Sequence, residues 1–156
     1  MKTGIGEDSH KFCKDKKLIL GGVEIDYEFG LKANSDGDVI AHCLCNAFDV
    51  VCNLGSLSNY ADEMLQKGIF ESLKYLEFIY QEAFKKGWKI NAISISVEAK
   101  LPKLEKSAVL IKRSLAKTLD LKTNNIGLTF TSGEGLSEFA KGKGIKAVSV
   151  ITFQKL

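Results

Sequence analysis

The chain has 156 residues, of which 45% are apolar and 26% are charged, and its formal net charge is +3. A chain of this size and composition can bury one hydrophobic core, so we expect a single domain over residues 1–156. Acidic and basic residues are interleaved, and no segment approaches the run of roughly 20 apolar residues that spans a membrane, so we expect a cytoplasmic protein with no nucleic-acid or membrane partner.

The first half of the chain carries the pattern of a bent strand followed by two helices. Residues 17–25 form two short apolar pieces around a Gly-Gly pair, which predicts a bent strand or a hairpin because glycine adopts backbone angles that other residues avoid. Apolar residues recur at helical spacing over residues 39–51, and Ser35 or Asp36 is expected to cap this helix. A second apolar stripe predicts a helix over residues 69–86, ended by a glycine.

The second half of the chain alternates strands with one further helix. Residues 93–97 and 126–130 show the two-residue alternation of strands with one buried face, and residues 146–153 form a last apolar strand. A helix is predicted from Pro102 to Leu119, because proline is tolerated in a first helical turn. These elements predict an α/β (α+β) fold, a single-domain sandwich of a mixed β-sheet with helices over one face.

Both histidines of the chain stand beside residues suited to binding a metal ion. His10 follows Asp8 by two positions, so both side chains point to the same side if the segment is extended. His42 shares a polar stripe of its predicted helix with Asp38 and Asn46, which directs it away from the core. We expect Asp38 and Asn46, one turn on either side, to orient the imidazole through hydrogen bonds.

Residue spacing leaves two interpretations of the histidines open. Two imidazoles and the Asp8 carboxylate form a three-ligand set with one tetrahedral position free for water or a phosphate oxygen, as in catalytic zinc sites. The alternative is a pair of unrelated surface or capping histidines. Cys43 and Cys45 flank His42, but the three residues do not face one ion on a helix, so we expect both cysteines to be small buried apolar groups.

Five segments of the chain resemble the 2-C-methyl-D-erythritol 2,4-cyclodiphosphate synthase family of the non-mevalonate isoprenoid pathway. They are GIGEDSH, LILGGVEIDYEFGL, NSDGDVIAHCLCNAF, AKLPKL and GLTFTSGEGL. The likeness covers nearly the whole chain, and it implies that Asp8, His10 and His42 bind one zinc ion per subunit. It also implies a homotrimer with active sites between neighbouring subunits.

The reaction implied by the resemblance is an intramolecular phosphoryl transfer by a phosphorus-oxygen lyase. In the cytidine diphosphate substrate, 4-diphosphocytidyl-2-C-methyl-D-erythritol 2-phosphate, the 2-phosphate attacks the β-phosphorus, closes a ring and expels CMP. Both reacting groups are anionic, so positioning and charge neutralisation dominate the catalysis. Glu134 is the implied ligand of a magnesium or manganese ion that arrives with the substrate.

The resemblance also implies a set of residues around the cytidine diphosphate. Thr131 and Ser132 orient the diphosphate, and Lys103, near the start of the predicted helix, faces phosphate and adds its charge to the helix dipole. The implied catalytic residues are Ser132, Lys103 and Glu134. The main chain of the cytidine loop reads the cytosine edge, and Lys141 occupies the place of an arginine near the trimer axis. The implied loop residues are Ala99, Pro102, Lys103 and Leu104. Without the resemblance, Glu134 and Ser132 are interpreted as ordinary turn residues and Lys103 as a solvated charge on a helix.

Three departures from the family pattern fall in the half of the site that holds the polyol. Asn34 replaces a histidine and keeps hydrogen bonding without a positive charge, next to Ser35. Ser56 stands where an acidic residue meets the ribose, and the lid loop is shortened to residues 59–63, in which Asp62 is the expected acidic group. Two rivals to an active synthase remain open: a degenerate homologue that binds zinc and a cytidine nucleotide without turnover, and a zinc hydrolase of another phosphoester.

Overall fold

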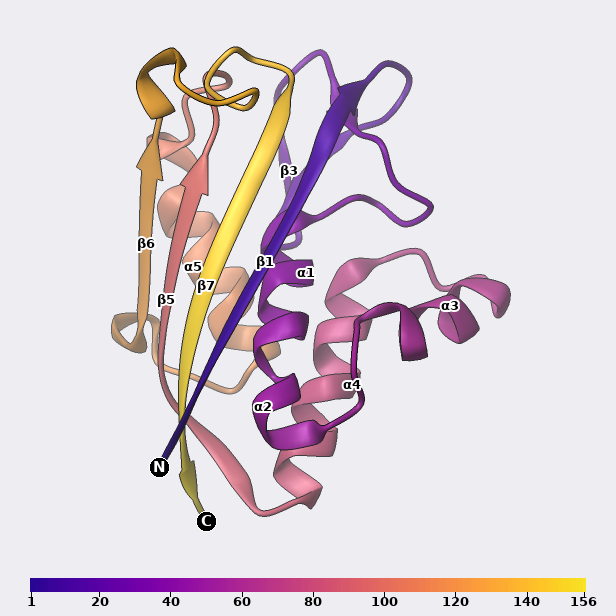
Figure 1. The fold of residues 1–156 in the computed structure, drawn as a ribbon, viewed down its shortest axis with the longest axis vertical. Helices are drawn as coiled ribbons and strands as arrows, with labels where there is room; N and C mark the ends of the chain where they lie inside the picture. The colour runs from indigo at the N-terminus through magenta and orange to yellow at the C-terminus, as the bar shows by residue number, and fades with distance from the viewer.

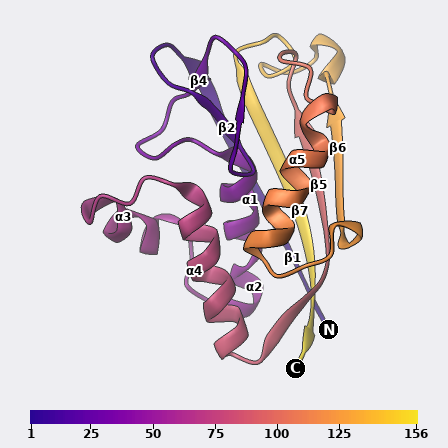
Figure 2. The same ribbon diagram turned by 180° about the vertical axis from the view of Figure 1, so that it is seen from behind.

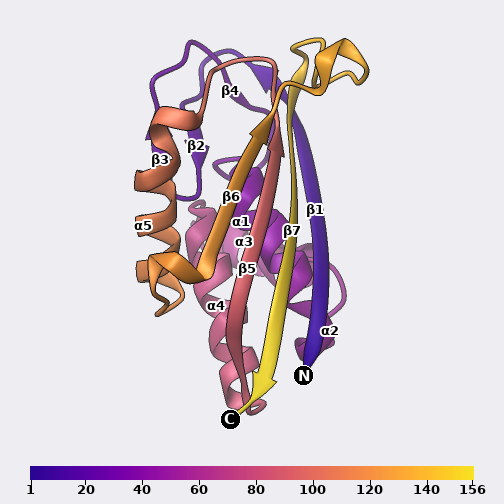
Figure 3. The same ribbon diagram turned by 90° about the vertical axis from the view of Figure 1, so that its left-hand side faces the viewer.

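A computed structural model describes all 156 residues and contains a mixed five-stranded sheet (Figure 1). Its strands are β1 (Lys2–Cys13), β4 (Gly30–Leu31), β5 (Trp88–Glu98), β6 (Ile126–Thr131) and β7 (Gly144–Lys155). The spatial order is β4-β1-β7-β5-β6, and Figure 3 shows β6, β5, β7 and β1 side by side. Neighbours run antiparallel except β5 and β6, which are parallel, so the predicted mixed sheet is confirmed.

The helices cover one face of this sheet. They are α1 (Val39–Ala47), α2 (Asp49–Cys52), α3 (Ser58–Gln66), α4 (Ser72–Lys85) and α5 (Ala108–Thr118). The strands lie in front of α1 and α5 in Figure 1, and α5 lies in front of the strands in Figure 2, which is seen from behind. The predicted fold class, with helices over one face, is therefore confirmed. None of the helices combines the length and apolar character that crossing a membrane requires.

Several predicted elements are confirmed with shifted boundaries. The hairpin of residues 17–25 is β2 (Leu18–Leu20) paired with β3 (Val23–Ile25). The helix predicted over residues 69–86 is the shorter α4. The residues expected to form a shortened lid loop lie instead within α3, so that prediction was wrong.

Two predicted helix starts were also wrong. The first helix is capped by neither Ser35 nor Asp36, because the Asp38 carboxylate accepts hydrogen bonds from the backbone N–H groups of Ile40 and Ala41. The third helix does not begin at Pro102. It starts with the 3₁₀ turn Glu105–Ser107 and continues as α5, so Lys103 precedes the first helical turn.

Glycines in β1 let helix α1 lie unusually close to the sheet. A Cβ atom at Gly4 would stand 1.9 Å from the Ala47 carbonyl oxygen, and one at Gly6 would stand 2.0 Å from the Cys43 carbonyl oxygen. Cys43 and Cys45 are buried in the core beneath, as predicted. Because residues two apart on a strand share a face, the face that carries the two glycines continues to Asp8 and His10.

Candidate metal centre and substrate cavities

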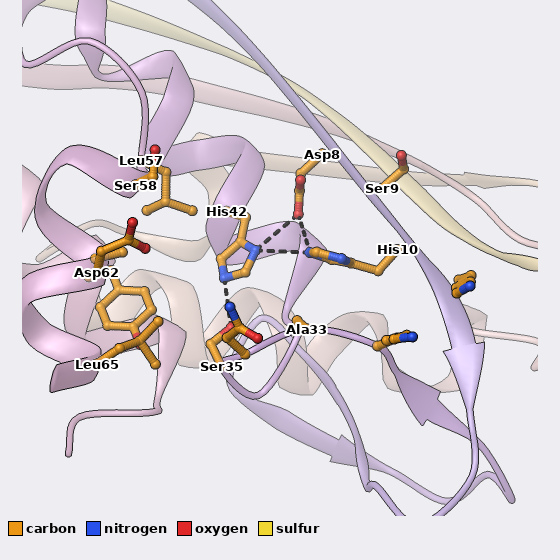
Figure 4. A pocket seen from close by; sticks show the side chains of 15 residues that line it. Asp8, Ser9, His10, Ala33, Ser35, His42, Leu57, Ser58, Asp62 and Leu65 are labelled. Atoms are coloured by element: carbon orange, nitrogen blue, oxygen red, sulfur yellow. Dashed lines mark hydrogen bonds and ion pairs between the residues drawn. The ribbon is translucent and has the colours of Figure 1, made fainter.

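Asp8, His10 and His42 converge on one point in the wall of a cavity (Figure 4). Asp8 and His10 extend from β1, and His42 extends from α1, which the β1 glycines bring near. Asp8 Oδ2 lies 3.0 Å from His10 Nε2 and 3.0 Å from His42 Nδ1, and the two ring nitrogens are 3.3 Å apart. The predicted meeting of the three side chains is confirmed.

The chemistry of this cluster suits a divalent metal ion. Its ligand atoms all lie within 4.8 Å of one another, and two imidazole nitrogens with one carboxylate oxygen are the donors that a divalent transition metal prefers. Burial acts to raise the pKa of Asp8, but the hydrogen bonds and charges of His10 and His42 outweigh it and lower the pKa to about 2. Asp8 is thus ionised near neutral pH, which is the form that binds a cation.

The Nε2 side of the His42 ring contacts two serines, and an aspartate holds one of them. His42 Nε2 lies 2.8 Å from Ser72 Oγ and 3.3 Å from Ser35 Oγ (Figure 4 marks a contact behind the ring beside Ser35). The Ser72 hydroxyl donates to the Asp36 carboxylate, so its oxygen is left to accept the Nε2–H of His42. This arrangement turns the Nδ1 lone pair of His42 toward Asp8 and His10.

The expectation that Asp38 and Asn46 orient His42 was wrong. The Asp38 carboxylate is fully buried and accepts from the N–H groups of Gly21 at 2.8 Å and Gly22 at 2.7 Å, in addition to capping α1. Asn46 donates to the Glu7 carbonyl at 3.1 Å and accepts from the backbone N–H of residue 57. His42 itself is only 5% exposed, so it lies in the cavity floor rather than on a solvated stripe.

Most residues expected on the polyol side line the same cavity. The cavity has a volume of about 580 Å³, and Asn34, Ser35 and Asp62 are among its walls. Ser56 is outside it, and its hydroxyl is 2.7 Å from that of Ser58. The sequence reasoning missed several further lining residues. They are Ser9, Lys11, Lys32, Leu57, Ser58 and Tyr75.

A second cavity lies at the carboxyl ends of the parallel strands β5 and β6. It has a volume of about 180 Å³. Six residues that the sequence resemblance grouped together line it: Ala99, Pro102, Lys103, Leu104, Thr131 and Ser132. Glu134 follows in the exposed 3₁₀ turn Gly133–Gly135, and Lys141 lies further on, paired with Glu138 at 3.0 Å. Neither Glu134 nor Lys141 lines this cavity.

The two cavities occupy different parts of the sheet. The metal cluster depends on β1, whereas the second cavity depends on β5 and β6, and β7 lies between them in the strand order. The fold and the site therefore define a class: α/β proteins with a mixed sheet and, in an open cavity, a His-His-Asp cluster that could hold a metal ion.

Within this class, the chain belongs to the YgbB family, whose model matches residues 1–154. It is 39% identical over 161 residues to the 2-C-methyl-D-erythritol 2,4-cyclodiphosphate synthase of Chlamydia trachomatis serovar L2, covering 99% of this chain and 88% of the relative. It is 37% identical over 155 residues to the synthase of the same name from Chlamydia muridarum, covering 97% and 86%.

Solved structures agree with this assignment. A 2-C-methyl-D-erythritol 2,4-cyclodiphosphate synthase matches with a TM-score of 0.89 and 28% identity over 98% of this chain and all of the other, and it was also solved in a CDP-bound form. The bifunctional IspDF from Campylobacter jejuni matches with a TM-score of 0.90 and 32% identity over 99% of this chain. This chain spans 42% of that longer protein.

Proposed function

We propose that this chain converts 4-diphosphocytidyl-2-C-methyl-D-erythritol 2-phosphate to 2-C-methyl-D-erythritol 2,4-cyclodiphosphate and CMP, as a phosphorus-oxygen lyase. The observation that carries this proposal is the convergence of Asp8, His10 and His42 in an open cavity, in a chain that matches named synthases over 99% of its length. No feature of the site favours a binding protein without turnover.

The metal held by Asp8, His10 and His42 is proposed to be zinc, one ion per chain. Three protein ligands and an open cavity suit a zinc ion that keeps a position free for a phosphate oxygen. When bound, the ion supplies Lewis acidity and a template for the substrate phosphate. The hydrogen bond from His42 Nε2–H to Ser72 keeps the ring turned so that Nδ1 faces the cation.

The second cavity is proposed to hold the cytidine diphosphate. Lys103, Thr131 and Ser132 line this cavity, and an ammonium group and two hydroxyls are donors that suit diphosphate oxygens. The exposed Glu134 carboxylate beside them suits a magnesium or manganese ion shared with the diphosphate. The main chain of residues 99–104 is proposed to read the cytosine.

The proposed reaction requires the protein to hold two anionic groups of the substrate, the 2-phosphate and the diphosphate, close together. An oxygen of the 2-phosphate forms a bond to the β-phosphorus, and the bond from that phosphorus to the bridging oxygen breaks, so CMP leaves with the electron pair. Lys103 offsets charge on the diphosphate, and Asn34, Ser35 and Asp62 hold the polyol end in the first cavity. We assign no proton transfer to a side chain, because the attacking phosphate oxygen is already ionised.

A homotrimer is proposed because the two cavities must meet around one substrate. Within one chain they lie on different strands of the sheet, so a neighbouring chain is needed to place one against the other. The sheet face away from the helices offers a surface for this contact, since Ile5 on it is 72% exposed. Lys141 is proposed to lie near the trimer axis.

The proposed activity is tested by incubating the purified protein with the substrate, zinc and magnesium and measuring CMP. We expect CMP release from the wild-type protein. The His42→Ala variant should release CMP about 100-fold or more slowly, because the site loses one of its three zinc ligands. The synthase assignment fails if the wild-type protein releases no CMP. Binding of CDP without any turnover would instead establish the degenerate homologue.

A further inference from the structure

The loop that joins β4 to α1 contributes three consecutive residues to the wall of the first cavity. They are Ala33, Asn34 and Ser35. Asn34 is exposed, whereas Ser35 is buried and its hydroxyl lies 3.3 Å from His42 Nε2. The place of each of these side chains in the cavity therefore depends on what holds the backbone of the loop.

The backbone of residues 33–35 forms no hydrogen bond with any other backbone group. The loop is tied on both sides of this stretch, because the N–H of Lys32 donates to the Lys11 carbonyl at 2.8 Å and the N–H of Asp36 donates to the Phe70 carbonyl at 3.0 Å. Between these two ties, only side chains are left to hold the peptide groups.

The side chain of Lys16 holds the carbonyls on either side of Asn34. Its Nζ donates to the Ala33 carbonyl at 3.0 Å and to the Ser35 carbonyl at 2.6 Å. Lys16 forms no ion pair and does not line the cavity, so its ammonium group acts on the loop alone. Hydrogen bonds from a charged donor are stronger than those between neutral groups, so two of them fix this short stretch.

Close packing against β4 brings Lys16 within reach of the loop. Asp15, just before it, has a φ of 64°, in the left-handed region, where the chain turns after β1. A Cβ atom at Gly30 would stand 2.6 Å from the Cβ and 2.6 Å from the carbonyl oxygen of Lys16. The missing side chain of Gly30 thus lets Lys16 lie against β4, which ends two residues before Ala33.

We propose that Lys16 is a positioning residue, which fixes the backbone around Asn34 so that Asn34 and Ser35 hold one arrangement in the cavity wall. Its effect on substrate rests on the proposed function, in which these two residues hold the polyol end. A loop that is ordered before the substrate arrives loses less conformational freedom on binding, which strengthens binding without any new contact. Lys16 itself touches neither the substrate nor the reacting phosphates.

Nitrogen-15 relaxation of the zinc-loaded protein tests the ordering of the loop without any turnover. In the Lys16→Met variant, which keeps a long apolar side chain and removes the ammonium group, we expect the backbone order parameter of Asn34 to fall from about 0.85 to below about 0.6. Lys14→Met is the matched control, because Lys14 is an exposed lysine of the same segment that forms no ion pair or hydrogen bond. The Lys16→Arg variant keeps a cationic donor and should retain the order of the loop.

Steady-state CMP release tests the consequence for the substrate. We expect Lys16→Met to raise KM about tenfold and to change kcat less than about threefold, because the lost ordering affects substrate binding rather than the phosphoryl transfer. A lysine that only supported the fold would instead lower the amount of active protein and leave KM unchanged.

Equal order parameters in the Lys16→Met and Lys14→Met variants would overturn the proposal, as would an equal loss of order in Lys16→Arg and Lys16→Met. A more mobile loop with an unchanged KM would also overturn it, because the loop would then not position the substrate. If the wild-type protein releases no CMP, the proposed function fails, whereas the order parameters still decide whether Lys16 fixes the loop.

Discussion

At the scale of single residues, the proposed metal centre depends on which nitrogen of His42 carries the proton. The carboxylate of Asp36 accepts from the Ser72 hydroxyl, and Ser72 accepts from His42 Nε2, so Nδ1 is free to bind a cation. This set could not be found from the sequence, because Ser72 is 30 residues from His42 and belongs to another helix. The sequence offered only the polar neighbours of His42 on its own helix, Asp38 and Asn46, as partners for the ring. Both form hydrogen bonds with other groups instead.

A Ser72→Ala substitution should therefore weaken zinc binding. We expect a decrease in affinity of about 10-fold to 100-fold, because a metal-binding imidazole that loses the partner of its second nitrogen is oriented less well. Competition with a chromophoric chelator measures the effect. Ser107→Ala is the matched control, since the Ser107 side chain makes no capping hydrogen bond. Equal zinc affinity of the two variants would show that Ser72 does not orient His42.

At the scale of elements, the glycines of β1 decide how near α1 approaches the sheet. They also explain why β1 was not predicted: its buried positions near the N-terminus are Gly4 and Gly6, so the strand lacks the apolar residues that identified β5, β6 and β7. The convergence of Asp8 with His10 was nevertheless predictable, because it needs only an extended segment.

Helix α3 illustrates a different reason for a wrong prediction. Its apolar residues Tyr60, Ala61, Met64 and Leu65 recur at helical spacing and pack on the core, so the pattern was present in the sequence. The family resemblance implied a lid loop at residues 59–63, and that implication outweighed the helical pattern. The pairing of β1 with β4, in which Phe12 lies opposite Leu31, depends on strand register, and a single sequence without a regular hairpin turn does not fix that register.

A Gly6→Ala substitution should disturb both the fold and the metal centre. The new Cβ would lie 2.0 Å from the Cys43 carbonyl oxygen and 2.6 Å from the Ala47 nitrogen, so α1 must move away from β1. We expect a loss of about 1–3 kcal/mol in the free energy of unfolding, measured with urea, together with weaker zinc binding.

The matched control is Gly127→Ala, where the nearest atoms to a new Cβ lie at 3.7 Å. It should change the free energy of unfolding by less than the Gly6→Ala variant and leave zinc binding intact. Unchanged zinc affinity in Gly6→Ala would contradict the view that this close contact sets the metal geometry.

At the scale of the whole molecule, the residues of the proposed reaction divide between two regions of one chain. Asp8, His10 and His42 belong to the first cavity, and Lys103 and Ser132 line the second. Most residues that the family resemblance groups together line one cavity or the other, but Ser56, Glu134 and Lys141 line neither, and a sequence gives no distance between regions. Only the strand order reveals that β7 separates them.

Mixing inactive subunits tests whether the active site is shared. The His42→Ala and Lys103→Ala variants should each be inactive alone, and co-expression should restore about a quarter of the wild-type CMP release, since random assembly pairs the intact halves at about that fraction of interfaces. Co-expression of His42→Ala with Asp8→Ala, which damage the same half, should restore nothing. Equal results for the two mixtures would exclude a site between subunits.

The most direct measurement is a zinc titration of chelator-stripped protein, followed by CMP release in the presence of magnesium. We predict almost no release without zinc, a linear rise up to one zinc ion per chain, and a plateau beyond it, because Asp8, His10 and His42 form one three-ligand centre. Full CMP release from the zinc-free protein, or a one-zinc endpoint that persists in the His42→Ala variant, would contradict the account.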